Sequence, residues 1–130
     1  MAISAQEIDQ LSQEFRRCQK LLLALGDETR QHLILEMMQI PDCGGARVNA
    51  ITERTNLSRP AVSHHIGILK DAGLVKMRRE STKNYYYFDT DAGALNDLLR
   101  LLEHTRDIMG RLPDRSGEGT PAAVTKEVCP

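Results

Sequence analysis

The segment from Ser58 to Gly73 constrains the fold of this chain more than any other part of the sequence. Ser58 is a residue that caps helices well, Pro60 is tolerated in a first helical turn, and Gly73 is typical of a helix end. Between them, apolar residues recur at helical spacing and form an inner stripe: Val62, Ile66 and Leu69. A shorter helical pattern, with Asn49 as its expected cap, precedes this helix, so the pair predicts a helix-turn-helix.

The period of the sequence changes after this helix pair. Two strand-like runs, 74–79 and 85–88, flank a polar stretch and predict a β-hairpin. Alternation sends Tyr86 and Phe88 to one face and the other two tyrosines to the opposite face. We expect at least one of these pairs to pack on the helices, and core packing rather than base stacking to be the role of most of them.

Three more helical patterns surround these elements. Apolar residues at steps of three and four predict helices over about 5–25, 27–40 and 92–109, and Asp27 is the expected cap of the second of these. The expected fold is therefore mainly α with a small β-hairpin, which is the element order of a winged helix-turn-helix domain. The last helix is more apolar than one small core requires, so we expect a homodimer through the first and last helices.

The length of 130 residues fits one domain. We expect that domain to span residues 1–112 and a flexible tail to span residues 113–130, which hold three of the five prolines. No apolar run is long enough to predict a membrane span, and the first residues lack the pattern of a secretory signal. Three widely spaced cysteines favour a reducing compartment, so the expected location is cytoplasmic.

The net charge of −1 conceals an uneven distribution. The segment from Arg54 to Lys83 carries seven basic and two acidic residues, for a net charge of +5. Such a segment in an otherwise acidic chain is typical of a surface that contacts phosphate. Charge alone leaves a solvated face as an equal alternative.

Three runs of the sequence resemble the bacterial ArsR/SmtB repressors. They are Leu-Ala-Leu-Gly-Asp-Glu-Thr-Arg at 23–30, Leu-Ser-Arg-Pro-Ala-Val-Ser-His-His-Ile at 57–66, and Leu-Lys-Asp-Ala-Gly-Leu-Val at 69–75. The resemblance extends over about 21–109. It implies a homodimeric, cytoplasmic transcriptional repressor whose partner is an imperfectly palindromic operator in double-stranded DNA, and whose affinity for that operator falls when an effector binds.

A helix held in the major groove exposes to DNA the residues that do not face its own core. Arg59 is the best candidate for a guanine edge, because its guanidinium can donate two hydrogen bonds there. Three arginines have other expected roles: Arg54 would clamp the backbone, while Arg78 and Arg79 would reach flanking phosphates from the hairpin. The full set of expected DNA-binding residues is Arg54, Ser58, Arg59, Ser63, His64, Arg78, Arg79 and Lys83. His65 lies nearer the buried side, where a packing histidine is an equal alternative.

The sequence departs from the family at its effector sites. Members often carry a thiolate metal site before the recognition helix, but residues 48–55 contain no cysteine. At the family's other metal site, on the last helix, only three potential ligands remain: Asp91, His104 and Asp107. We therefore expect no metal and no other cofactor. Cys18 and Cys43 bracket the second helix and are candidates for a thiol switch, although Cys18 also fits a core position. The effector stays open between a metal, a thiol oxidant, a small molecule and none.

Two other classes of function are alternatives to DNA binding. A winged helix used only for protein contacts predicts an apolar or acidic recognition surface, which the basic segment argues against. The sequence shows no nucleophile with a paired base and no glycine-rich phosphate loop, so we expect no enzymatic activity.

Overall fold

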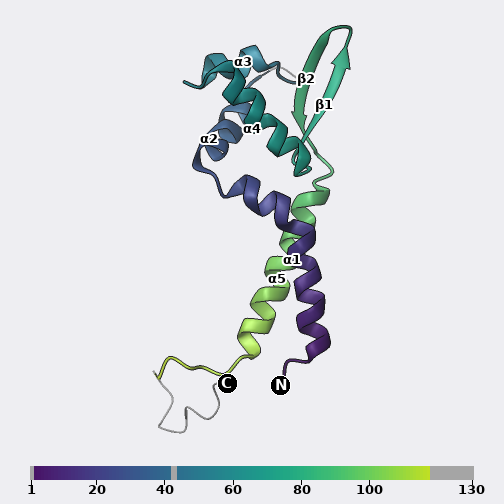
Figure 1. The fold of residues 1–130 in the computed structure, drawn as a ribbon, viewed down its shortest axis with the longest axis vertical. Helices are drawn as coiled ribbons and strands as arrows, with labels where there is room; N and C mark the ends of the chain where they lie inside the picture. Colours follow the sequence, from purple (N-terminus) through teal and green to yellow (C-terminus); the bar gives the residue numbers. More distant parts are fainter. Residues whose placement is uncertain (1, 42–43, 118–130) are drawn as a thin grey trace.

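The computed structural model describes residues 2–41 and 44–117 (Figure 1). In this part of the chain five α-helices accompany one antiparallel hairpin, in the predicted order. The elements are α1 (Ala5–Leu25), α2 (Glu28–Met38), α3 (Val48–Arg54), α4 (Arg59–Asp71), β1 (Val75–Glu80), β2 (Lys83–Phe88) and α5 (Gly93–Arg111). The predicted fold class, a winged helix-turn-helix, is confirmed.

Two predicted helix caps are confirmed and one is wrong. The Asp27 side chain accepts a hydrogen bond from the Arg30 amide at 2.9 Å, and the Ser58 hydroxyl accepts one from the Ala61 amide at 3.3 Å. Asn49, however, is not a cap, because α3 already begins at Val48 and has no side-chain cap.

The start of α3 is set by a strand contact instead of a cap. Ala46 and Tyr86 exchange two backbone hydrogen bonds of 2.8 Å in an isolated β-bridge. This bridge holds the chain extended up to Arg47, after which the helix starts. Tertiary pairing therefore replaces the local signal.

The hairpin, called the wing below, is longer than predicted. Its strands pair from Val75 with Phe88 to Glu80 with Lys83, so only two residues form the turn. One of these, Ser81, has a φ of 57°, which lies in the left-handed region that such short turns require. The pair Tyr86 and Phe88 packs against the core, as expected from the alternation.

The molecule divides into a head and a stalk (Figure 1). The head contains α2, α3, α4 and the wing around a core in which Leu33, Ile51, Ile66 and Leu69 are at most 1% exposed. The stalk consists of α5 and most of α1, which run antiparallel beside each other and project away from the head. The last turns of α1 enter the head, where Leu21 and Ala24 belong to its core. No helix in the described residues is long and apolar enough to cross a membrane. Residues 113–117 belong to no helix or strand, and the rest of the predicted tail, 118–130, lies outside the described residues.

Candidate nucleic-acid interface

Helix α4 is fixed by one face and leaves the other free. Its apolar stripe is buried to 1% exposure or less at Val62, Ile66 and Leu69. Because residues three and four apart share a helix face, the intervening residues turn outward. The exposed residues of this face include the expected DNA contacts Arg59, Ser63 and His64. The Ser58 hydroxyl, also expected to contact DNA, serves as the cap of the helix.

The expected basic contacts differ in how far other groups of the chain already hold them. Arg54 forms an ion pair of 3.2 Å with Glu36 of α2. Arg78 donates to Glu80 at 3.1 Å and to the Gly44 carbonyl at 2.6 Å, and its guanidinium lies over the Tyr85 ring. These contacts orient both side chains within the head.

Three other basic side chains have no such contact in the part of the chain that the structure describes, and they are called uncommitted below. Among the described residues, no ion pair or side-chain hydrogen bond engages Arg47, Arg59 or Lys83. Arg79 is intermediate, since within residues 2–41 and 44–117 its side chain donates only to the carbonyl of Ser81, in the turn of the wing, at 3.1 Å. The uncommitted cations keep their full capacity for an external anion.

A polar hollow of about 250 Å³ opens between the start of α3, the wing and α4, the second helix of the helix-turn-helix, which is called the recognition helix below. Both uncommitted arginines, Arg47 and Arg59, line it. The other polar side chains of the lining carry amides or hydroxyls, and they include Asn49, Ser63, Thr82 and Asn84. No acidic side chain of the described residues lines this hollow. Two guanidiniums with surrounding hydrogen-bond donors and no carboxylate make a site for an anion.

Four residues of this site were not predicted from the sequence: Arg47, Asn49, Thr82 and Asn84. Three of them are neutral and escape a count of charges, and Arg47 lies outside the basic segment from Arg54 to Lys83. The hollow exists only because the bridge at Ala46 brings the start of α3 beside the wing. No pattern within one segment predicts that contact.

The two adjacent histidines have different surroundings. His64 is exposed, whereas His65 is partly buried with its Nδ1 3.3 Å from the guanidinium of Arg30. Because arginine only donates, His65 accepts this hydrogen bond in its neutral form. Burial in the first place, and then the charge of Arg30, lower the pKa of His65. His65 is thus a packing residue here.

Arg30, which was not predicted from the sequence as a structural residue, joins three helices. It donates to the carbonyls of Ala24 at 2.9 Å and Leu23 at 3.0 Å, at the end of α1, and it reaches His65 on α4. Its position in the Leu-Gly-Asp-Glu-Thr-Arg run was the available signal.

The three potential metal ligands do not come together within one chain. Asp91 precedes α5, while the other two lie in its second half, roughly 16 Å (His104) and roughly 21 Å (Asp107) from the start of the helix at about 1.5 Å per residue. His104 contacts Glu14 of α1 at 2.5 Å, and Asp107 pairs with Arg111 at 3.2 Å. Among the described residues, no three His, Cys, Asp or Glu side chains form a group that would hold a metal ion.

The cysteine candidates for a thiol switch are only partly described. Cys18 is buried at 3% exposure in the stalk, and this burial raises the pKa of its thiol. A raised pKa disfavours the reactive thiolate, in keeping with a core role. Cys43 lies outside the described residues.

The chain is similar to known bacterial and archaeal regulatory proteins. Residues 27–77 match the family described as "Bacterial regulatory protein, arsR family". An HTH-type transcriptional regulator of Methanocaldococcus jannaschii is 32% identical over 91 residues, which are 70% of this chain and 97% of that protein. The transcriptional repressor SdpR of Bacillus subtilis is 34% identical over 67 residues, which are 52% of this chain and 70% of that protein.

A solved structure shares the fold. It is the homodimeric winged helix-turn-helix DNA-binding domain of a possible ArsR-family regulator from Mycobacterium bovis, which is 24% identical in sequence. The match has a TM-score of 0.51 and covers 88% of this chain and 100% of that one.

Proposed function

The chain belongs to the ArsR family of bacterial transcriptional regulators, and on this premise we propose that it is a repressor that binds an operator in double-stranded DNA as a homodimer. The proposal includes the imperfect two-fold symmetry of the operator and its release by an effector. The observation that carries it is the polar hollow, where Arg47 and Arg59 face the space between recognition helix and wing without a partner in the described residues. The relative in B. subtilis, named as a repressor, supports the direction of regulation.

In this proposal the side chains divide into two groups by the part of DNA they contact. Helix α4 enters the major groove, and Arg59, Ser63 and His64 contact base edges. The remaining basic and hydroxyl groups position the protein on the backbone: Arg47, Arg54, Ser58, Arg78, Arg79 and Lys83. Arg54 and Arg78 would exchange a present partner for a phosphate or share it.

The proposed dimer interface is the outer face of the stalk. Large apolar side chains remain exposed there, among them Phe15 on α1 at 44%, and Leu99 and Leu102 on α5 at 54% and 53%. An apolar surface of this kind, on helices already packed against each other on one side, is suited to a second copy of the chain. The homodimeric solved relative supports this assembly. We place both DNA binding and dimerisation in residues 1–112.

The test starts by selecting DNA fragments from the source genome on the purified full-length chain. Affinities for a selected fragment and for a random duplex are then compared by fluorescence anisotropy at several salt concentrations. Arg47→Ala should weaken both DNAs by similar factors and reduce the slope of log affinity against log salt by about 0.9, as for one lost phosphate contact.

Arg115→Ala is the matched control, because it removes the same charge from an exposed position beyond the stalk. It should leave affinity and slope nearly unchanged. Failure to select any fragment would contradict the proposed function, and an equal effect of both substitutions would contradict the role of the hollow.

A further inference from the structure

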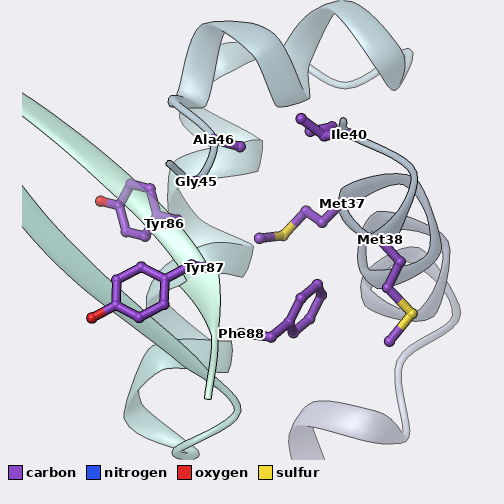
Figure 2. A pocket seen from close by; sticks show the side chains of 8 residues that line it. All are labelled: Met37, Met38, Ile40, Gly45, Ala46, Tyr86, Tyr87 and Phe88. Atoms are coloured by element: carbon purple, nitrogen blue, oxygen red, sulfur yellow. The ribbon is translucent and has the colours of Figure 1, made fainter. Parts of the chain in front are cut away.

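A second hollow, of about 270 Å³, lies between the wing, the end of α2 and the loop that leads into α3 (Figure 2). Its lining is mostly apolar and includes Met37, Met38, Ile40, Ala46, Tyr86 and Phe88. In Figure 2 the side chain of Met37 extends from α2 toward β2 and the ring of Phe88 extends from β2 toward α2, while Met38 points in another direction at the edge of the hollow. Nothing in the proposed contacts with DNA uses this hollow.

The lining restricts the chemistry of an occupant. No charged side chain of the described residues lines the hollow, so an ion would lose its hydration without a counter-charge. Thioethers beside aromatic rings favour a flat, polarisable molecule. The volume of the hollow, about 270 Å³, lies just below the range of about 300–1,000 Å³ that is usual for ligand pockets, which restricts the ligand to one or two rings.

The hollow is connected to the candidate DNA interface through shared residues. Tyr86 lines both the apolar and the polar hollow. Ala46 lines the apolar hollow and is paired with Tyr86, while the next residue, Arg47, lines the polar one. The same loop is tied to β1, because the Gly44 carbonyl accepts a hydrogen bond from Arg78. An occupant therefore contacts the residues that set the distance between α3 and the wing.

From this arrangement we propose that the apolar hollow binds a small, uncharged aromatic molecule, and that its occupation weakens the binding of DNA. The ligand acts as a wedge between α2 and β2. It moves Tyr86 and Arg47 out of the positions in which they border the polar hollow. The regulatory half of this inference rests on the proposed function, whereas ligand binding itself does not.

The experiment uses 2-naphthol, which is planar, uncharged at neutral pH and carries one hydroxyl group. Its binding to the full-length chain is followed by ligand-observed NMR. Met38→Glu places a carboxylate at the hollow, and since Met38 is 63% exposed, the substitution leaves the core intact. Leu35→Glu is the matched control, because Leu35 lies on the same helix, is 58% exposed and does not line the hollow. We expect Met38→Glu to weaken binding of the probe about tenfold or more, and Leu35→Glu to leave it unchanged.

A second variant tests the same site by volume. Ala46→Leu adds three carbon atoms at the lining and should also weaken binding of 2-naphthol, provided that its circular dichroism spectrum matches that of the wild type. Saturating 2-naphthol should lower the affinity of the wild-type chain for the selected DNA fragment by about threefold or more, and this effect should disappear in Met38→Glu.

The outcomes separate the two proposals. Equal binding of the probe by the wild type and Met38→Glu would overturn the ligand site, and binding without any change in DNA affinity would overturn the regulation. If the wild type selects no DNA in the absence of probe, the proposed function fails, while the comparison of probe binding still decides whether the hollow is a ligand site.

Discussion

At the scale of the residue, the arginines of the head differ in what holds them. Arg59 has no partner among the described residues, whereas Arg78 is oriented by Glu80, by the Gly44 carbonyl and by the Tyr85 ring. An arginine that is held in place by other groups contributes a fixed positive charge. A guanidinium without such partners, on the recognition helix, is able to donate two hydrogen bonds to one guanine. Their substitution should therefore have different consequences.

We predict that Arg59→Ala costs about 1–3 kcal/mol on the selected fragment and relaxes the preference at one or two base pairs, with a smaller loss on random DNA. Replacing Arg78 and Arg79 together by Ala should weaken both DNAs by similar factors, because phosphate contacts carry no sequence information. Affinity measurements on a set of single-base variants of the fragment check this. If Arg59→Ala leaves the base preference intact and the wing variant abolishes it, the two roles are the reverse of those proposed.

The pair of Arg30 and His65 predicts a pH dependence of stability. The lowered pKa of His65 means that, below the ordinary value of 6.5, the unfolded chain binds more protons than the folded one. The free energy of unfolding should therefore fall as the pH decreases below 6.5 toward the lower pKa of the folded state. Urea denaturation at about pH 7.5 and about pH 5.5 measures this loss, in a window above the titration of the carboxylates.

The variant His65→Gln should lose less stability than the wild type between these two pH values, because it has no imidazole to protonate at this site. His32→Gln is the control, since His32 is an exposed histidine of α2. A wild-type loss that persists in His65→Gln would assign the pH dependence to another group.

At the scale of the element, prediction from sequence succeeded where the signal is local. The caps at Asp27 and Ser58 and the buried stripe of α4 depend on residues within one helix, and all three are confirmed. The predicted start of α3 was wrong, because the true start depends on the bridge between Ala46 and Tyr86, which are distant in the sequence. The same limit applies to the candidate site, whose exposed helix face was predictable but whose hollow forms only between three elements.

The loop before α3 offers a test of this long-range control. Gly45 has a φ of 101°, and a Cβ atom at this position would lie 2.9 Å from the carbonyl oxygen of Tyr86. We predict that Gly45→Ala lowers the free energy of unfolding by about 1–3 kcal/mol, through backbone strain and the close contact.

Gly67→Ala is the matched control for this substitution. Gly67 lies within α4, and a Cβ there meets nothing within 4 Å. It should raise the free energy of unfolding by about 0.5–1 kcal/mol, because alanine favours the helix. Urea denaturation measures both effects, and a neutral Gly45→Ala would show that the bridge tolerates displacement.

At the scale of the whole molecule, the stalk predicts the state of assembly. Sedimentation at micromolar concentration should give twice the chain mass of 14.6 kDa. Leu102→Glu should shift the equilibrium toward the monomer, because it would bury a carboxylate in the proposed interface. Leu35→Glu, at a similarly exposed apolar residue of the head, should leave the dimer intact. A wild-type monomer that still binds the selected fragment tightly would contradict the proposed assembly.

Arg30 fastens the end of the stalk to the recognition helix, through Leu23, Ala24 and His65. In the proposed dimer, the packing of the two stalks therefore determines the distance between the two recognition helices, and this distance cannot be adjusted within each head. When an inserted base pair moves the half-sites of an operator apart, substitutions in α4 should therefore not restore repression. We expect suppressor mutations that restore repression of such a promoter to map to α1 and α5, far from any residue that contacts the inserted base.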